Sequence, residues 1–217
     1  MSDYAHNFKE YSNFFKKFVC HDLQIFDISK SAKLVDIGCG FGDEICKLHD
    51  FGYANVSGIE PDIYAVKKCV DNNLDVRQGS IDKTGCRDVS FEAVLVNCVF
   101  HHVSDYDKAL KEIHRILKPG GYLCFIEPHP SWQRHLLDLL TFKTPLPMLV
   151  HGFKMRRTTV GEEIATGLYP QWLREYNDFL KLVDNYFELL WLRKGALFCF
   201  GKARKRDRAR NAQYGSK

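Results

Sequence analysis

The sequence has 217 residues, of which 45% are hydrophobic and 27% are charged. This balance excludes a disordered or fibrous chain and predicts one domain, or one domain with an insertion. No stretch approaches the roughly 18 consecutive apolar residues of a membrane span, and the N-terminal segment lacks the apolar core of a secretion signal. We therefore expect a cytoplasmic protein.

The net charge of +4 arises from the C-terminal end. Residues 202–217 contain seven Lys or Arg against one Asp, so residues 1–201 carry 24 basic and 26 acidic residues. This predicts a basic, mobile tail over residues 204–217. The remaining residues are slightly acidic and do not indicate a nucleic-acid partner. The eight cysteines form no CxxC pair and no cluster with histidine at zinc-ligand spacing, which predicts reduced thiols and no metal site.

Aromatic residues at spacings of three and four over residues 7–26 predict an amphipathic helix, and residues 1–30 are expected to form a helical cap. From Lys33, segments typical of strands alternate with segments typical of helices. The expected strands are LVDIG, NVSGIE, LDVRQGS, FEAVLVNCV and YLCFIEP, and the expected helices are EICKLHDFG, DIYAVKKCVDNN and SDYDKALKEIHRIL. This alternation predicts a parallel sheet, and the Lys-Pro-Gly-Gly run at 118–121 predicts a helix end and a turn.

Residues 131 to about 168 interrupt the alternation with several prolines and glycines, which predicts an inserted lid after the fifth strand. A helix, QWLREYNDFLKLVDN, and two strands, YFELLWLR and ALFCFGKAR, follow, and a turn at Lys194-Gly195 predicts an antiparallel hairpin. The predicted fold is therefore α/β: a Rossmann-like sheet of seven strands, mostly parallel with a C-terminal antiparallel hairpin and helices on both faces. The domain is expected to span residues 31–203.

A glycine-rich segment follows the first expected strand. Gly38, Gly40 and Gly42 stand between that strand and a helix, and Glu60 ends the next strand. Glycines permit positive φ and close approach to a ligand, and an acid at this place can accept ribose hydroxyls. The spacing is G-x-G-x-G instead of the dinucleotide pattern, and the Asp36 carboxylate would repel a pyrophosphate. A nucleoside that carries an ammonium or sulfonium group fits better.

The motifs D-I-G-C-G-F-G, G-I-E-P-D, F-E-A-V-L-V-N-C-V-F-H-H-V and L-K-P-G-G-Y-L-C-F-I-E-P stand in this order. With them, residues 33 to about 127 resemble the cofactor half of class I S-adenosylmethionine-dependent methyltransferases. The resemblance implies S-adenosyl-L-methionine as cofactor, with the following contacts: Asp36, Gly38, Cys39, Gly40 and Gly42 to the methionine part, Glu60 to the ribose, Pro61 and Ile81 to the adenine, Ser80 or Asp82 to its amino group, and Asn97 and Cys98 to the sulfonium side. Many relatives have an acid at the position of Ser80.

Ligands of open α/β sheets bind beyond the carboxyl ends of the strands, which makes His101, His102, Glu127 and His129 candidates for chemistry. We expect His102 or His129 to act as the base, although a structural role is an equal alternative for each. His101 is expected to point elsewhere and Glu127 to complete its strand. Four candidates for acceptor binding are Tyr11, Trp132, Arg156 and Arg157; the two arginines suit an anionic group but could equally belong to a solvated basic loop.

The resulting functional prediction is methylation of a small-molecule acceptor, most favourably at a hydroxyl of a sugar, glycoconjugate or other metabolite. The segment from L-Y-P-Q-W-L-R-E to L-F-C-F-G-K also resembles methyltransferases of glycan biosynthesis. Alternatives are carboxyl O-methylation, N-methylation, methylation of tRNA with help from the basic tail, or cofactor binding without catalysis. The sequence shows no carboxylate cluster of the kind that a metal-assisted catechol-type enzyme needs, and it does not determine the oligomeric state.

Overall fold

The computed structural model describes residues 27–207. The helix expected over residues 7–26, with Tyr11 and most of the predicted cap, lies outside the described residues. The same holds for residues 208–217, which form most of the predicted basic tail.

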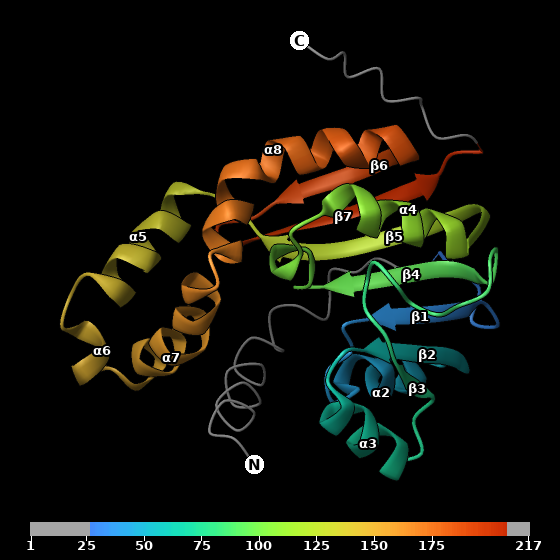
Figure 1. Ribbon diagram of the computed structural model, residues 1–217, viewed down its shortest axis with the longest axis horizontal. Helices are drawn as coiled ribbons and strands as arrows, with labels where there is room; N and C mark the ends of the chain where they lie inside the picture. Colours follow the sequence, from blue (N-terminus) through green and yellow to red (C-terminus); the bar gives the residue numbers. More distant parts are fainter. Residues whose placement is uncertain (1–26, 208–217) are drawn as a thin grey trace.

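Seven strands form a single sheet in the order β3-β2-β1-β4-β5-β7-β6. They are β1 (Lys33–Ile37), β2 (Asn55–Glu60), β3 (Val76–Gln78), β4 (Phe91–Asn97), β5 (Leu117–Pro128), β6 (Phe187–Lys194) and β7 (Phe198–Lys205). The first five pair in parallel, and β7 is antiparallel to both β5 and β6 (Figure 1). The predicted fold class, including the C-terminal hairpin, is confirmed.

The sheet buries both of its faces because successive strand residues point to opposite sides. Val35 and Val94 belong to one apolar core, together with residues of α4 (Tyr106–Ile116) and α8 (Leu168–Tyr186). Leu34 and Leu95 belong to a second core, together with residues of α2 (Asp43–Asp50) and α3 (Ile63–Asp71). Helices therefore cover both faces of the sheet and leave its carboxyl edge for a site.

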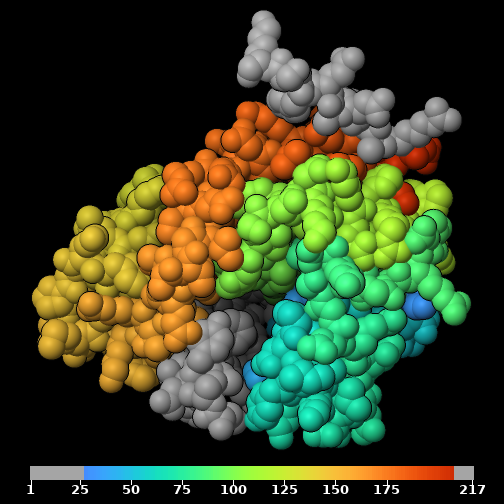
Figure 2. All heavy atoms as spheres, viewed as in Figure 1, coloured from blue at the N-terminus to red at the C-terminus, as the bar shows by residue number. Residues whose placement is uncertain are grey.

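The segment after β5 folds into three helices, α5 (Trp132–Phe142), α6 (Leu146–Leu149) and α7 (His151–Ala165), which we call the inserted helical unit. It stands beyond the end of the sheet to which β1 and β4 point (Figure 1), and in the space-filling view it is continuous with α8 (Figure 2). An insertion at 131–168 is expected from the sequence, but its helices are not. The residues that α7 buries are Arg156, Thr159 and Val160, which give no apolar periodicity.

Two boundaries differ from the sequence-based expectations. Strand β5 begins at Leu117, so the expected turn at 118–121 lies within a strand whose register shifts between Phe91 and Ala93 of β4. Strand β7 extends to Lys205, beyond the expected domain end at 203, and the Arg206 guanidinium then pairs with Asp184. Among residues 27–207, no helix is both long enough and apolar enough to cross a membrane.

Candidate functional site

The glycine loop between β1 and α2 has a backbone that only glycine adopts easily. Gly38, Gly40 and Gly42 have φ values of 74°, 54° and 80°. A Cβ atom on Gly38 would lie 2.3 Å from Cγ2 of Val99, whereas a Cβ atom on Gly40 would meet nothing within 4 Å. The loop is therefore packed against the chain that follows β4 on one side, and at Gly40 none of residues 27–207 would block a ligand that approaches the backbone.

Glu60 connects the end of β2 to this loop. Its Oε2 accepts a hydrogen bond from the Gly40 amide (2.8 Å), and its Oε1 accepts one from the Asp62 amide (3.0 Å). Burial raises the pKa of Glu60, and the two amide hydrogen bonds oppose that shift. A carboxylate offers about four acceptor sites, so about two sites are left for hydroxyl groups of a ligand.

Asp36 lies within β1 and is 2% exposed. Its Oδ1 has no hydrogen-bond partner among the described residues. Burial, together with the negative charges of Glu44 and Glu60, raises the pKa of this carboxyl well above its usual value. A buried polar atom without a partner is costly, and an ammonium group would supply both a donor and a compensating charge. Asp36, Gly40 and Glu60 therefore fit the methionine and ribose parts of the expected cofactor.

The residues expected beside the adenine follow β2 and β3, which pair at Glu60 and Gln78. The Ser80 hydroxyl donates to Asp82 Oδ1 (2.6 Å), and the Lys108 ammonium donates to Asp82 Oδ2 (2.7 Å). These hydrogen bonds, that of Lys108 first, lower the pKa of Asp82. Ile81 is buried and Pro61 is exposed. The structure brings the four residues to the edge beside Glu60, and their contact with adenine stays a prediction.

Asn97 ends β4, and Cys98 follows with an unusual φ of 57°. The Cys98 amide donates to the Ile126 carbonyl of β5 (2.7 Å), and burial raises the pKa of its thiol well above the usual value. The next residue, Val99, packs against Gly38 of the glycine loop. Both residues predicted for the sulfonium side are thus at the same edge of the sheet as Asp36 and Glu60.

Glu127, the residue before the end of β5, is completely buried and positions the chain that follows β4. Its Oε1 accepts hydrogen bonds from the amides of Val99 (2.8 Å) and Phe100 (2.7 Å), and its Oε2 lies 2.7 Å from Nδ1 of His101. Burial raises the pKa of Glu127 to about 8, against the effect of these N–H donors. The sequence-based expectation that His101 points elsewhere is therefore wrong: its ring is fixed by Glu127.

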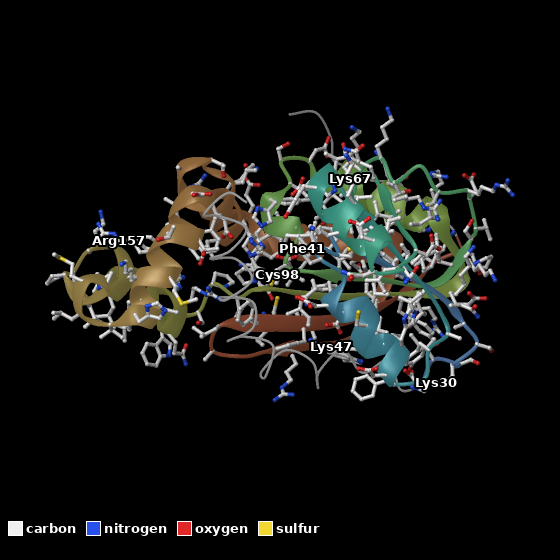
Figure 3. All side chains as sticks on the ribbon, turned by 90° about the horizontal axis from the view of Figure 1, so that it is seen from below. Lys30, Phe41, Lys47, Lys67, Cys98 and Arg157 are labelled. Carbon is white, nitrogen blue, oxygen red and sulfur yellow. The ribbon has the colours of Figure 1, made fainter. Side chains whose placement is uncertain are left out.

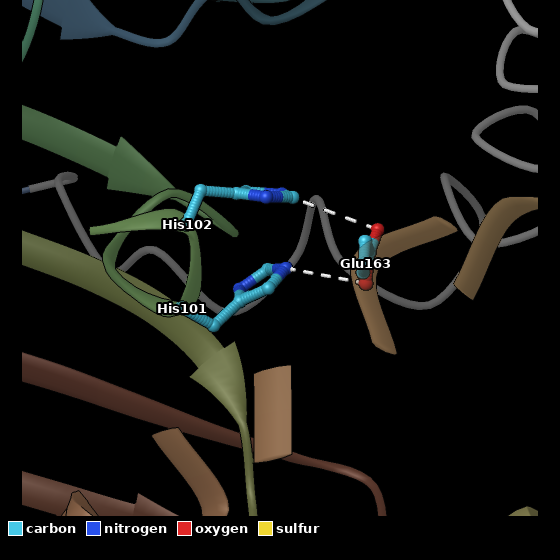
Figure 4. A group of neighbouring side chains, drawn as sticks. All are labelled: His101, His102 and Glu163. Atoms are coloured by element: carbon cyan, nitrogen blue, oxygen red, sulfur yellow. Dashed lines mark ion pairs between the residues drawn. The ribbon is translucent and has the colours of Figure 1, made fainter. Parts of the chain in front are cut away.

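His101 and His102 belong to a short 3-10 helix, η1 (Phe100–His102), and both face Glu163 of α7 (Figure 4). Nε2 of His101 is 3.7 Å from Glu163 Oε2, and Nε2 of His102 is 4.0 Å from Glu163 Oε1. Burial lowers the pKa of both histidines to about 4 and raises the pKa of Glu163. Sequence reasoning missed Glu163 because it follows the histidines by about 60 positions with no motif of its own.

His129 lies just beyond β5 and is tied to the β6–β7 turn. Its Nδ1 donates to the Gly195 carbonyl (2.7 Å), its amide donates to the Leu197 carbonyl (2.9 Å), and its ring packs edge-on against Tyr176. Because Nδ1 carries the proton, Nε2 is the basic nitrogen. The structure thus gives His129 a defined tautomer at the carboxyl edge of the sheet.

Three of the residues predicted for acceptor binding are described, and they stand in different surroundings. Trp132 is 71% exposed at the start of α5, and Arg157 lies on the outer part of the inserted helical unit, far from Cys98 (Figure 3). Arg156 is buried, where it pairs with Asp138 (2.5 Å) and donates to the Thr141 hydroxyl (3.2 Å). Tyr11 lies outside the described residues. The Arg156 guanidinium therefore joins α7 to α5 within the unit, and its role toward an acceptor stays a prediction.

Comparison with known proteins agrees with the geometry of the cofactor side. Residues 35–125 match a family model described as "Methyltransferase domain". A demethylmenaquinone methyltransferase from Chlorobaculum parvum is 29% identical over 130 residues, which cover 57% of this chain and 53% of that protein. A fatty-acid O-methyltransferase from Mycolicibacterium smegmatis is 26% identical over 166 residues, 66% of this chain and 59% of that protein. The chain spans little more than half the length of these curated relatives.

The fold as a whole has solved counterparts. A structure from Thermotoga maritima, described as an S-adenosylmethionine-dependent methyltransferase and possible histamine N-methyltransferase, superposes with a TM-score of 0.61 at 20% identity. The superposition covers 94% of this chain and 98% of that one. At this identity the likeness concerns the fold.

Proposed function

We propose that this chain, whose residues 35–125 match a methyltransferase family model, is a class I S-adenosylmethionine-dependent methyltransferase that transfers a methyl group from this cofactor to a small-molecule acceptor. The observation that carries the proposal is the buried Asp36 carboxylate. Its Oδ1 has no hydrogen-bond partner among residues 27–207, and it lies in β1 just before the glycine loop. A methionine ammonium satisfies that oxygen, whereas a pyrophosphate would be repelled.

Residues of this chain would bind and orient both reactants. When bound, S-adenosylmethionine supplies an electrophilic methyl group on a sulfonium. Asp36 holds the ammonium, Glu60 accepts the ribose hydroxyls, and Asn97 and Cys98 line the sulfonium side. An acceptor hydroxyl must lose its proton as the new oxygen–carbon bond forms, and we assign that proton to Nε2 of His102 or of His129.

A hydroxyl of a sugar, glycoconjugate or other metabolite is the acceptor that this histidine arrangement supports best. A second candidate is a hydroxyl or carboxyl group on an apolar molecule. Large apolar side chains are exposed on α5, on α6 and directly after it: Trp132, Leu136, Leu139, Met148, Leu149 and Val150. The names of two relatives, a demethylmenaquinone methyltransferase and a fatty-acid O-methyltransferase, also refer to apolar acceptors.

Release of S-adenosylhomocysteine during an acceptor screen tests the proposal. The panel contains sugars, isoprenoid quinols, fatty acids, small carboxylic acids, amines and tRNA. We expect turnover with a hydroxyl or carboxyl acceptor and with no nucleic acid. Calorimetry with the two cofactor forms and NAD checks the cofactor independently, and tighter binding of NAD would refute the assignment.

Alanine variants test the base. We expect His102→Ala or His129→Ala to lower turnover by at least about tenfold, since a positioned base contributes about 10²- to 10⁴-fold. The affinity for S-adenosylhomocysteine should stay near that of the wild type. His49→Ala, at an exposed position on α2, is the matched control and should leave turnover unchanged. Normal turnover in both variants would remove the base and favour an amine or an already ionised carboxylate as acceptor.

A further inference from the structure

The cluster of His101, His102 and Glu163 has the composition of a metal site. Two imidazoles and one carboxylate offer one ligand atom each, and these three atoms lie within 4.8 Å of one another. His101 is 4% exposed, and the Glu163 side chain is 12% exposed. The burial of His101 and of most of Glu163 distinguishes this group from the acidic clusters that occur on protein surfaces without a ligand. The cluster has no zinc-ligand spacing in the sequence, because η1 and α7 are far apart along the chain and come together only in the folded protein.

The hydrogen bond of His101 to Glu127 is an independent sign of a metal ligand. Histidines that bind metals usually donate their second ring N–H to a carboxylate, which fixes the tautomer and turns the other nitrogen toward the ion. Oε1 of Glu127 accepts the amides of Val99 and Phe100, and Oε2 meets His101 Nδ1 at 2.7 Å. When Nδ1 of His101 carries the proton and donates it to Oε2 of Glu127, Nε2 directs its lone pair at Glu163.

The spacing leaves room for an ion between the ligands. Nε2 of His101 and Oε2 of Glu163 are both acceptors in this tautomer, and their separation of 3.7 Å is too long for a hydrogen bond. Two ligands bound about 2.1 Å from a tetrahedral zinc ion lie about 3.4 Å apart. His102 is 4.0 Å from Glu163 and its side chain is 42% exposed, so it can close the remaining distance by a small rotation.

Arg156 and Arg134 favour the charged form of Glu163 from a distance, but their guanidinium groups make their polar contacts elsewhere. Of the two buried arginines in the inserted helical unit, Arg156 pairs with Asp138, and Arg134 donates to the Leu197 carbonyl and the Tyr169 hydroxyl. Among the described residues, the two histidines are the cationic or potentially cationic groups within ion-pair distance of the Glu163 carboxylate. An ion bound there would place a positive charge in direct contact with the carboxylate.

We propose that His101 Nε2, His102 Nε2 and Glu163 bind a divalent transition-metal ion, for which Zn²⁺ is the best match, with Glu127 as the positioning residue of His101. Three protein ligands leave a coordination position open, as in catalytic zinc sites. Since η1 directly follows the segment expected at the sulfonium, this position suits an oxygen of the methyl acceptor; that part rests on the proposed function. The ion would lower the pKa of a bound hydroxyl, and proton removal would then fall to His129.

Metal retention by full-length protein tests the site. Wild type, Glu163→Gln and the matched control Glu162→Gln, an exposed neighbour on α7, are stripped with a chelator, loaded with Zn²⁺, dialysed and analysed for bound metal. We expect the wild type and Glu162→Gln to retain one ion per chain, and Glu163→Gln to bind Zn²⁺ at least about 100-fold more weakly. Loading with Co²⁺ should give the visible absorption bands of a low-coordinate site in the first two proteins alone.

Equal retention by Glu163→Gln would assign the ion to the cysteines and overturn the proposal, as would no retention by the wild type. A Glu127→Gln variant that stays folded by circular dichroism should weaken Zn²⁺ binding about 10- to 100-fold while retaining the same absorption bands. Calorimetry of S-adenosylhomocysteine with the metal-free protein runs in parallel. Cofactor binding without metal binding refutes the metal site and leaves the methyltransferase assignment standing.

Discussion

Replacement of Glu60 by glutamine tests the cofactor side of the site most directly. Glu60 accepts the amides of Gly40 and Asp62, one at each carboxylate oxygen, which leaves about two acceptor sites for the ribose hydroxyls. In Glu60→Gln one oxygen becomes an NH₂ group, so an amide N–H and a ribose hydroxyl lose the same acceptor. The loss of a hydrogen bond to a charged group costs about 1.5 to 3 kcal/mol, which corresponds to about a 10- to 150-fold rise in Kd.

The measurement is titration calorimetry with S-adenosylhomocysteine on wild type and variant. Glu92→Gln is a matched control, because the Glu92 carboxylate also accepts a backbone amide, that of Lys33 (2.8 Å), but lies near the amino end of β4. We expect Glu92→Gln to bind with the wild-type Kd. A folded Glu60→Gln protein whose Kd stays within twofold of the wild type would refute the place of Glu60 in the ribose site.

Three further predictions concern stability. Gly38→Ala should lower Tm by at least about 4 °C, because it combines a left-handed backbone with a Cβ clash, whereas Gly85→Ala, at φ 69° with open space, should cost less; thermal unfolding compares the two. The hydrogen bond from Arg115 holds the pKa of Glu112 at about 2, so the stability that this carboxylate provides is present above about pH 4.5 and is lost as the pH falls toward 2. Glu112→Gln should flatten this part of the plot of unfolding free energy against pH, measured by urea unfolding. Removal of residues 208–217 should leave Tm and cofactor affinity unchanged, and a drop in either would show that this segment contributes.

The parts of the fold that the sequence predicts are those with a local pattern. Strands such as β4, FEAVLVN, are continuous apolar runs that both faces of a parallel sheet require, and Gly38 and Gly42 mark the loop between β1 and α2. Helix α7 could not be predicted in this way, because part of its buried face is polar: Arg156 pairs with Asp138 and donates to Thr141, both of α5. Such a face has no apolar period until its partners are known.

The same distinction applies to the site. Asp36, Gly40 and Glu60 stand within 25 residues of one another, and their chemistry follows from their places at strand ends. Glu163 and His101 are brought together by the fold of the inserted helical unit. The roles of Glu127 and His101 depend on the fact that their two buried side chains point toward each other. The sequence contains no signal for either.

The two sides of the candidate site therefore have different origins in the chain. The proposed cofactor side is built by β1, β2 and β4, all within the stretch 35–125 that matches the methyltransferase family model, apart from the first residues of β1. The proposed acceptor side begins two residues later with Glu127, which positions η1 by accepting hydrogen bonds from the amides of Val99 and Phe100. Helix α7 and the β6–β7 turn complete this side. Enzymes that use the same cofactor need the same cofactor-binding geometry, whereas enzymes with different acceptors need different acceptor-binding residues. We therefore expect residues 127–168 and the turn at Gly195 to determine which acceptor is used. Changes there should alter which acceptor is methylated while the affinity for S-adenosylmethionine stays constant.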